Sequence, residues 1–258
     1  MFVRTLDDLE KLGRIKFPAG ESFRSARYLT ASDGLGFSYN ENKVGKGTDL
    51  RVWLKHHWEA NYIITGKGEV TDLASNQSWP LSAGVLYVVG PNDRHRLYLT
   101  DDECHVSIFH PPLTGNERFD TDGSYEPSGV IPKTDRRMFV RTLAELRQSG
   151  HETAAENGQI QSTSMLSQAD DVGFTLDIDH FAAGVELDRE CGDYWQANHV
   201  LAGEGLVTDI ASGQSWELAP GTAFNTAPSE RYRLRANAEL DILRMTATSP
   251  NGTIGNKA

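Results

Sequence analysis

The chain has 258 residues, of which 24% are charged and 38% are hydrophobic, and its formal net charge is −11. This composition is typical of a water-soluble globular protein, while the acidic balance and the lack of a Lys/Arg run exclude a nucleic-acid-binding face. Two cysteines are too few for a disulfide framework, and no apolar stretch has the length of a membrane span. We therefore expect a cytoplasmic protein whose partner is a small molecule, not a nucleic acid or a membrane.

The opening residues MFVRTL recur unchanged at residues 138–143, an offset of 137 positions. The same offset aligns Trp58 with Trp195, and 15 of the 30 residues from Trp58 to Tyr87 are identical to their partners. Solenoid repeats are several-fold shorter, so a period of this length predicts two whole domains. We place them at 1–135 and 138–258, joined by a Pro- and Gly-rich tail and linker.

Each repeat begins with a short helix signal, in which Thr5 precedes acidic residues in the first repeat. Short β-rich runs follow, separated by turn residues: RYLTA, GFSYNEN, DLRVWLK, NYIITGKGEV, VLYVVG, RLYLT and HVSIFH. Gly66-Lys67-Gly68 and Gly203-Glu204-Gly205 lie between such runs and are predicted to be hairpin turns. Many short strands with little helix predict an all-β protein with two tandem jelly-roll barrels of the cupin type.

The first repeat contains the spacing of two cupin motifs. Glu59 is followed after six residues by Gly66, and a turn that ends at Gly84 is followed after two residues by Tyr87. His95 comes eight residues later, on the next strand. We expect Glu59, Tyr87 and His95 to meet inside the barrel as ligands for Fe(II), Mn(II) or Zn(II), with open positions for a substrate. Taken singly, a Glu is more often solvated and a Tyr more often packed with its hydroxyl hydrogen-bonded.

The second repeat lacks these ligands. The offset of 137 pairs the three residues with Gln196, Phe224 and Tyr232, and pairs Arg27 with Ser164. Each substitution removes a good metal ligand but keeps a side chain of similar bulk. The comparison predicts one metal per chain, in the first half, and a structural role for the second repeat.

Other histidines are weaker candidates for metal ligands. Of His56 and His57 at most one could face the site, because adjacent strand residues point to opposite faces. We expect His105 and His110 to be strand-end or tail residues.

Four segments of the first repeat resemble ectoine synthase, a cytoplasmic cupin that closes a cyclic amidine. They are MFVRTLDDLE, KHHWEANYIITGKGEV, LSAGVLYVVGPNDRH and the tail HPPLTGNERFDTDGSY, of which the tail is the most specific. The resemblance covers about the first 125 residues. It implies that Glu59, Tyr87 and His95 hold a catalytic iron. It also implies a substrate site built from Phe23, Ser25, Arg27, Asn40, Asn42, Phe109 and Glu117.

The chain departs from the family pattern at three positions in or near this substrate site. Phe23 stands where the family has a Trp, Asn42 where it has a Thr, and Phe119 where it has a His. The family is also single-domain and dimeric, with modules that pair head to tail. We therefore expect the two repeats to pair within the chain, which would give that contact a high effective concentration, and further homodimerisation stays open.

The activity implied by the resemblance is that of a carbon–oxygen lyase (a hydro-lyase) that closes N-γ-acetyl-2,4-diaminobutyrate to a cyclic amidine. Arg27 would bind the substrate carboxylate, unless it is a solvated surface arginine. Glu117, in the tail, would be an acid/base group or the partner of the amine, with the tail as a lid.

Two other functions fit the same residues. An iron-dependent oxygenase or lyase acting on a related amino acid derivative would need the same open metal site. A non-catalytic, ligand-binding bicupin would hold no metal and turn over no substrate.

Overall fold

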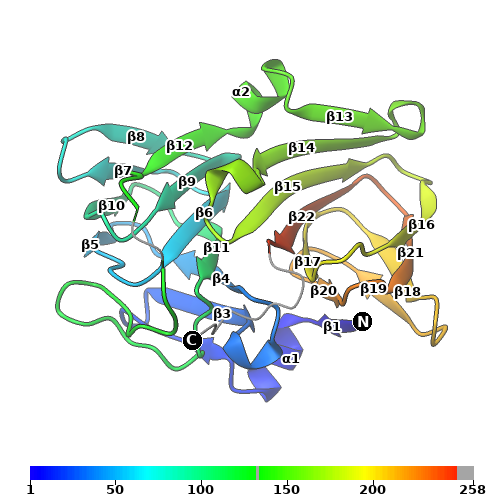
Figure 1. The fold of residues 1–258 in the computed structure, drawn as a ribbon, viewed down its shortest axis with the longest axis horizontal. Coiled ribbons are helices and arrows are strands. Elements are labelled where there is room, and N and C mark those ends of the chain that lie inside the picture. The colour runs from blue at the N-terminus through cyan, green and yellow to red at the C-terminus, as the bar shows by residue number, and fades with distance from the viewer. Residues whose placement is uncertain (132–133, 249–258) are drawn as a thin grey trace. The chain divides into compact units, whose positions relative to one another are not determined.

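The computed structural model describes residues 1–131 and 134–248. It divides into two units. The first barrel comprises Leu9–Ala144, and the second barrel comprises Met1–Asp8 together with the described residues from Glu145 onward. Nearly all elements in both are short antiparallel strands, so the prediction of an all-β protein is confirmed (Figure 1).

The first barrel is built from a seven-stranded and a four-stranded sheet. The larger sheet has the order β12 (Phe139–Thr142), β9 (Val85–Val89), β6 (Trp58–Thr65), β11 (Glu103–His110), β4 (Ser38–Val44), β3 (Phe23–Leu29) and β2 (Ile15–Lys16). The smaller sheet has the order β5 (Asp49–Val52), β10 (His95–Leu99), β7 (Gly68–Asp72) and β8 (Ser78–Leu81).

The second barrel has two sheets of the same sizes and the same order of equivalent strands. Its larger sheet contains β1 (Phe2–Arg4), β20 (Ala223–Thr226), β17 (Gln196–Ala202), β22 (Leu240–Ala247), β15 (Phe174–Phe181), β14 (Ile160–Leu166) and β13 (Glu152–Ala155). Its smaller sheet contains β16 (Glu186–Glu190), β21 (Arg231–Ala236), β18 (Gly205–Asp209) and β19 (Ser215–Leu218).

The first strand of each repeat belongs to the sheet formed by the other repeat. β1 pairs with β20, where Val3 lies opposite Phe224, and β12 pairs with β9, where Val140 lies opposite Tyr87. The structural units therefore begin and end at different residues from the sequence repeats.

A short helix follows each of these strands: α1 (Leu6–Lys11) and α2 (Leu143–Gln148). Thr5 caps α1, because its hydroxyl accepts a hydrogen bond from the backbone N–H of Asp8, and the Asp8 carboxylate accepts one from the backbone N–H of Thr5 at 2.9 Å. The predicted N-terminal helix signal is confirmed. Three 3₁₀ turns complete the elements: η1 (Ala31–Asp33), η2 (Glu156–Gly158) and η3 (Gln168–Asp170).

The prediction of hairpin turns at Gly66-Lys67-Gly68 and Gly203-Glu204-Gly205 is wrong. β6 pairs with β9 and β11, whereas β7 pairs with β8 and β10, so the first of these segments carries the chain from one sheet to the other. A Cβ atom on Gly66 would lie 2.5 Å from the carbonyl oxygen of Asp102, and its φ is +98°. The glycine is needed for close backbone packing at the crossing.

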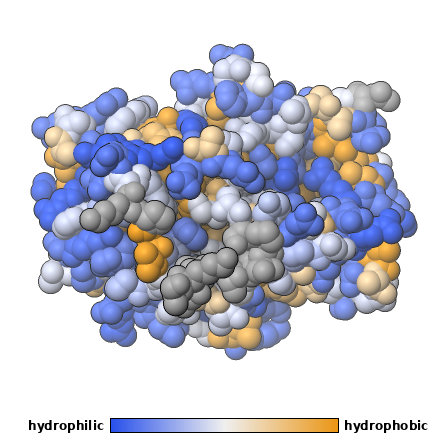
Figure 2. Space-filling model, viewed as in Figure 1, coloured by the Kyte–Doolittle hydropathy of each residue, from blue (hydrophilic) through white to orange (hydrophobic). Residues whose placement is uncertain are grey.

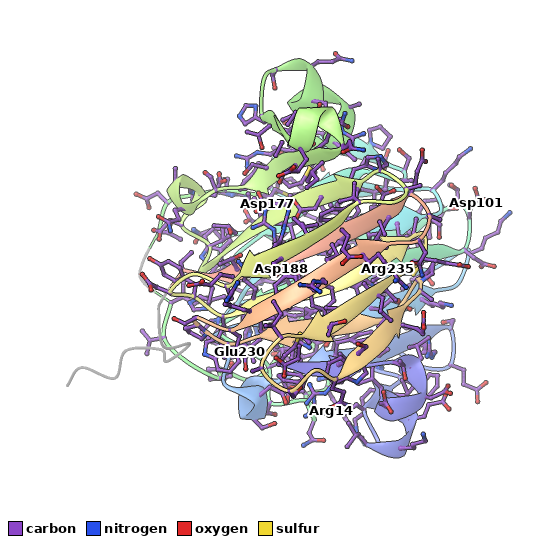
Figure 3. All side chains as sticks on the ribbon, turned by 90° about the vertical axis from the view of Figure 1, so that its right-hand side faces the viewer. Arg14, Asp101, Asp177, Asp188, Glu230 and Arg235 are labelled. Carbon is purple, nitrogen blue, oxygen red and sulfur yellow. The ribbon has the colours of Figure 1, made fainter. Side chains whose placement is uncertain are left out.

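Each barrel has its own apolar core, built from side chains that alternate along the strands. β21 shows the alternation most clearly, because every second residue of its sequence RYRLRA is buried. Its exposed Arg235 is labelled in Figure 3. Charged side chains occupy many outward positions, and the face drawn in Figure 2 is mainly hydrophilic. Within the described residues, no helix has the length and apolar character needed to cross a membrane.

Candidate active site

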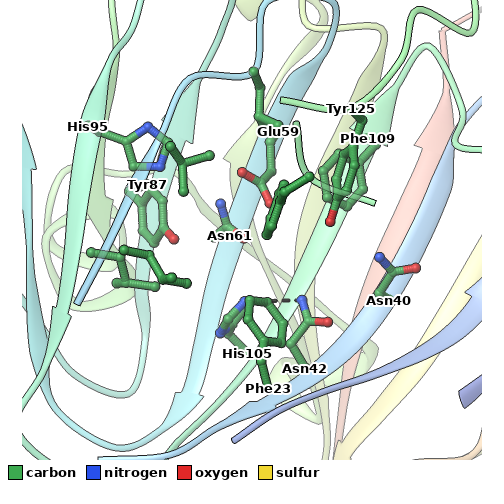
Figure 4. Close-up of a pocket in the computed structure, with 15 residues that line it drawn as sticks. Phe23, Asn40, Asn42, Glu59, Asn61, Tyr87, His95, His105, Phe109 and Tyr125 are labelled. Carbon is green, nitrogen blue, oxygen red and sulfur yellow. Dashed lines mark hydrogen bonds between the residues drawn. The ribbon is translucent and has the colours of Figure 1, made fainter. Parts of the chain in front are cut away.

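A cavity lies inside the first barrel, between side chains of both sheets and of the tail that follows β11 (Figure 4). The volume open to the centre of a water-sized sphere is about 30 Å³, so the cavity is narrow in this structure.

Glu59, Tyr87 and His95 all line this one cavity. Glu59 is on β6, Tyr87 is on the neighbouring strand β9, and His95 is on β10 of the opposite sheet. The ring centroids of Tyr87 and His95 are 6.2 Å apart. The structure therefore brings together the three side chains proposed as metal ligands, and Glu59 faces the cavity instead of the outer surface.

The cavity disfavours an isolated charge on any of the three. Burial raises the pKa of Glu59, and the nearby polar groups of Asn61 and Ser107 offset this only in part. Burial, followed by the charges of Glu59 and Glu103, raises the pKa of Tyr87 well above its usual value. Burial lowers the pKa of His95 to about 4. A cation here would favour the ionised carboxylate and phenol, and it would find the imidazole already neutral.

The chemistry of this donor set fits a divalent metal. A carboxylate, a phenol and an imidazole suit Fe(II), Mn(II) or Zn(II). His95 Nδ1 lies 3.5 Å from the backbone oxygen of Asp93, which leaves Nε2 available for a ligand bond. In the parts of the chain that the structure describes, no three His, Cys, Asp or Glu side chains form a cluster that could hold a metal.

His105 also belongs to the cavity, so its prediction as a strand-end or tail residue is wrong. It lies within β11, is 3% exposed and lines the cavity, and its Nδ1 is 2.8 Å from a carboxylate oxygen of Glu103. His110, in contrast, is the last residue of β11, and its Nδ1 is 3.0 Å from the backbone oxygen of Gly36.

Three further polar residues accompany His105. The Asn42 amide donates hydrogen bonds toward His105 Nε2 at 3.1 Å and to the Ser107 hydroxyl at 2.9 Å, and Ser107 donates to Asn61 Oδ1. Of these, Asn61 and Ser107 were not predicted. Strand alternation could have found Ser107 and His105, because they follow Phe109 backward along β11 at intervals of two residues.

Aromatic side chains form another wall. Phe23 and Phe109, both predicted substrate contacts, line the cavity beside Asn40 and Asn42. The tail adds Phe119 and Tyr125, whose rings stack at 4.7 Å, and Tyr125 meets Phe109 edge to face at 5.9 Å. The tail thus completes a largely apolar enclosure.

The remaining predicted substrate residues, Ser25, Arg27 and Glu117, are not among the side chains that line the cavity. Arg27 and Glu117 form an ion pair of 2.8 Å with each other, and Arg27 is 1% exposed. The alternative of a solvated surface arginine is therefore wrong. Burial acts to raise the pKa of Glu117, but hydrogen bonds from Thr114 and Gly115 outweigh it and keep the pKa below its usual value.

Of the two adjacent histidines, His57 is fully buried, and neither His57 nor His56 lines the cavity. His57 Nε2 is 2.9 Å from the Ser128 hydroxyl, and its ring packs edge-on against Phe109 and Tyr125. Burial lowers its pKa to about 4. His57 therefore supports the aromatic wall from behind.

The second barrel has a different interior at the equivalent positions. Phe224 and Tyr232 pack edge to face at 5.4 Å, where the first barrel has Tyr87 and His95. Arg244, at the position of Ser107, forms ion pairs with Asp177 at 3.0 Å and Asp179 at 2.8 Å. The positive charge of Arg244 thus offsets the negative charges of Asp177 and Asp179 inside the second barrel.

Comparisons with known proteins match both halves of the chain to one family. The ectoine synthase family model matches residues 1–129 and again residues 138–253. The L-ectoine synthase of Desulfosudis oleivorans is 42% identical over 127 residues, which are 49% of this chain and 97% of that protein. The enzyme of Halomonas elongata is 35% identical over 128 residues, which are 50% of this chain and 93% of that protein.

Solved structures show the same fold at low sequence identity. Protein Ylba from E. coli gives a TM-score of 0.69 at 11% identity, with 95% of this chain and 89% of that one covered. Oxalate decarboxylase from Bacillus subtilis, whose Mn(II) centres have been described, gives 0.67 at 12% identity, with 96% and 77% covered. The predicted cupin fold is confirmed, and the chain belongs to the ectoine synthase family.

Proposed function

We propose that the first barrel is a metal-dependent cyclodehydratase that closes N-γ-acetyl-2,4-diaminobutyrate, or a close relative, to a six-membered cyclic amidine. The α-amine attacks the carbonyl carbon of the same molecule's acetamide, a C–N bond forms, and the carbonyl oxygen leaves as water. The observation that carries this proposal is the convergence of Glu59, Tyr87 and His95 on one cavity in a member of the ectoine synthase family.

The aromatic walls would hold the substrate in a folded conformation. Phe23, Phe109, Phe119 and Tyr125 surround the cavity and limit access of bulk water. Binding that holds the amine against the acetamide lowers the activation free energy of ring closure. Exclusion of bulk water favours the loss of water from the ring.

Glu59, Tyr87 and His95 would hold one divalent cation, for which Fe(II) is our first choice and Zn(II) and Mn(II) are alternatives. When bound, such a cation supplies Lewis-acid polarisation of an amide oxygen. The Mn(II) centres of the structurally similar oxalate decarboxylase support the capacity of this fold for such ions.

Arg27 and Glu117 would bind the charged ends of the substrate. The guanidinium of Arg27 suits a carboxylate, and its Nε has no hydrogen-bond partner among the described residues. Glu117, held in its ionised form, suits the amine and can accept its proton. Both roles require their mutual ion pair to open when substrate enters.

The second barrel would serve as a scaffold without chemistry of its own. Gln196, Phe224 and Tyr232 replace the three proposed ligands, and Arg244 already supplies a cation to Asp177 and Asp179. We propose one metal per chain for this reason.

An assay on N-γ-acetyl-2,4-diaminobutyrate, with metal-loaded protein and NMR detection of the ring, tests the proposal. We expect equal rates with and without O₂, because cyclodehydration transfers no electrons. Turnover that requires O₂ would instead identify an oxygenase. No turnover and no bound metal would point to a ligand-binding bicupin.

A further inference from the structure

The junction between the two sequence repeats contacts one turn of the first barrel. We call residues Thr134–Arg137 the junction segment; they lie just before β12, within the same structural unit as the turn. The turn is Gly90–Asp93, between β9 and β10, and the backbone N–H of Asp93 donates to the carbonyl oxygen of Gly90 at 3.0 Å. Pro91 occupies its second position, where proline favours such a turn. The proposed reaction assigns no role to this contact.

This turn lies next to all three strands that carry the proposed metal ligands. Tyr87 comes shortly before it on β9, and His95 comes shortly after it on β10. Gly90 packs against the indole of Trp58, the residue that precedes Glu59 on β6, and a Cβ atom on this glycine would lie 2.5 Å from the ring. The position of the turn therefore affects how the three ligand strands are arranged.

Arg137 holds the turn through a fully buried carboxylate. Asp93 Oδ2 accepts a hydrogen bond from the backbone N–H of Gly90 at 2.9 Å, and Asp93 Oδ1 accepts one from Arg137 Nε at 2.7 Å. The same guanidinium donates to Asp72 Oδ1 at 3.1 Å, and Asp72 lies opposite His95 on β7. A buried carboxylate needs such partners, because an unpaired charge away from water is costly. One cation thus joins two carboxylates on either side of His95.

The backbone of the junction segment fixes Arg137 in this place. The side-chain amide of Asn92 donates to the backbone oxygens of Thr134 at 2.6 Å and of Arg136 at 3.3 Å. On the other side of Arg137, β12 pairs with β9. A half-exposed arginine on a mobile chain would contribute little, because ordering its long side chain costs entropy. Here the backbone on both sides is already held.

The second barrel has the same contact with a different cation. Glu230 occupies the position of Asp93, and its carboxylate accepts from the backbone N–H of Ala227 at 2.7 Å. The α-amine of Met1 lies 2.5 Å from that carboxylate. An ammonium group can therefore take the place of the guanidinium. The contact holds the turn in both barrels, but only in the first barrel does the turn lie between proposed metal ligands.

We propose that Arg137 is a positioning residue for the metal site of the first barrel. It holds the Gly90–Asp93 turn, and with it the strands of Tyr87 and His95, in the arrangement in which both side chains face one cavity. Ligands that are already in place bind a cation more tightly, because less ordering is needed on binding. This inference rests on the proposed metal site, and it gives the junction between the repeats a role in that site.

Metal binding by variants of Arg137 tests the positioning role. Competition with a chelator gives the dissociation constant for Fe(II) alone, and the visible spectrum of bound Co(II) reports the arrangement of its ligands. Arg137→Met should raise the Fe(II) dissociation constant by about tenfold or more and change the Co(II) spectrum. Arg137→Lys should stay close to the wild type, because an ammonium group serves in the second barrel. An unchanged constant and spectrum in folded Arg137→Met would overturn the inference.

Glu230→Gln is the matched control, because it removes the equivalent carboxylate in the second barrel. It should lower the free energy of unfolding but leave both metal readouts unchanged, and an equal loss of Fe(II) affinity would overturn the inference as general destabilisation. If Arg137→Met does not fold, Asp93→Asn replaces it: the amide oxygen still accepts from Gly90, so Fe(II) binding should weaken without loss of the turn, and unchanged binding would overturn the inference. A wild type that binds no Fe(II) would overturn the proposed metal site itself.

Discussion

The two barrels have the same strand order, but the polar side chains on the inner face of the larger sheet are charged in the second barrel and neutral at the equivalent positions of the first. In the second barrel, Arg244 lies between Asp177 and Asp179, and Arg189 adds a further contact of 3.2 Å to Asp179. In the first barrel the positions equivalent to Arg244, Asp177 and Asp179 hold the neutral Ser107, Asn40 and Asn42. One interior is closed by its own ion pairs, whereas the other keeps polar atoms free beside a cavity.

This difference shows how one fold can serve as a scaffold or as a site. Burial alone would raise the pKa of Asp179, but the Arg244 guanidinium outweighs it and holds the pKa below its usual value. The Arg244 ion pairs thereby provide a partner for the carboxylates of Asp177 and Asp179. The first interior leaves groups for a ligand to satisfy, at a cost in stability that function can justify.

The largest effect is expected from Arg244→Ser, which removes the cation of the second interior. Asp177 would lose this cation and Asp179 would keep only its contact with Arg189, so the free energy of unfolding should fall by about 3–5 kcal/mol, as measured by urea denaturation. The triple variant Arg244→Ser/Asp177→Asn/Asp179→Asn installs the residues of the first barrel and should recover most of the loss. A loss below about 1 kcal/mol in Arg244→Ser would show that the ion pairs do not hold this interior together.

A smaller loss of folding stability is expected at acidic pH, and it should arise in the first barrel. His57 is buried with its pKa lowered to about 4, so the unfolded chain, with a pKa near 6.5, takes up a proton that the folded barrel refuses. Stability should fall as the pH decreases from about 6.5 toward 4, by about 2 kcal/mol at pH 5. His57→Asn should remove this loss in denaturation curves measured at pH 7 and pH 5.

Two controls separate this histidine from other acid-sensitive groups. Ser128→Ala keeps the imidazole and should keep the acid sensitivity. Asp179 has a lowered pKa, so its contribution is present above the normal Asp pKa and is lost only as the pH falls below about 4. Unchanged pH dependence in His57→Asn would assign the loss near pH 5 to another group.

No additional metal binding is expected when the three proposed ligands are introduced into the second barrel. The triple variant Gln196→Glu/Phe224→Tyr/Tyr232→His should bind no second metal, because the Arg244 guanidinium already places a positive charge in that interior. Elemental analysis gives the metal-to-chain ratio. A second bound metal would show that ligand identity alone separates the two barrels.

Motif spacing was sufficient to predict that Glu59, Tyr87 and His95 share one cavity, although it missed Asn61 and His105. Glu59, Tyr87 and His95 are adjacent to turns of fixed length, so their faces follow from the pattern of a jelly roll. The alternation along β11, extended backward from Phe109, could have placed His105 in the cavity wall.

Other features depend on contacts between distant parts of the chain. The Arg27–Glu117 ion pair and the covering of the cavity by Phe119 and Tyr125 arise because the tail folds back over β3 and β4, which local patterns do not encode. The Gly66 segment has the sequence of a hairpin turn, and only its close approach to Asp102 distinguishes the crossing between sheets. The exchange of β1 and β12 likewise follows from sheet pairing and not from any signal in MFVRTL.

The metal content of Glu59→Gln tests the central claim most directly, since this substitution gives the first barrel the residue that the second has at Gln196. After metal removal and reloading with Fe(II), we expect one ion per chain in the wild type, none in Glu59→Gln, and one in the matched control Gln196→Glu. Full metal in Glu59→Gln, or two ions per wild-type chain, would contradict it.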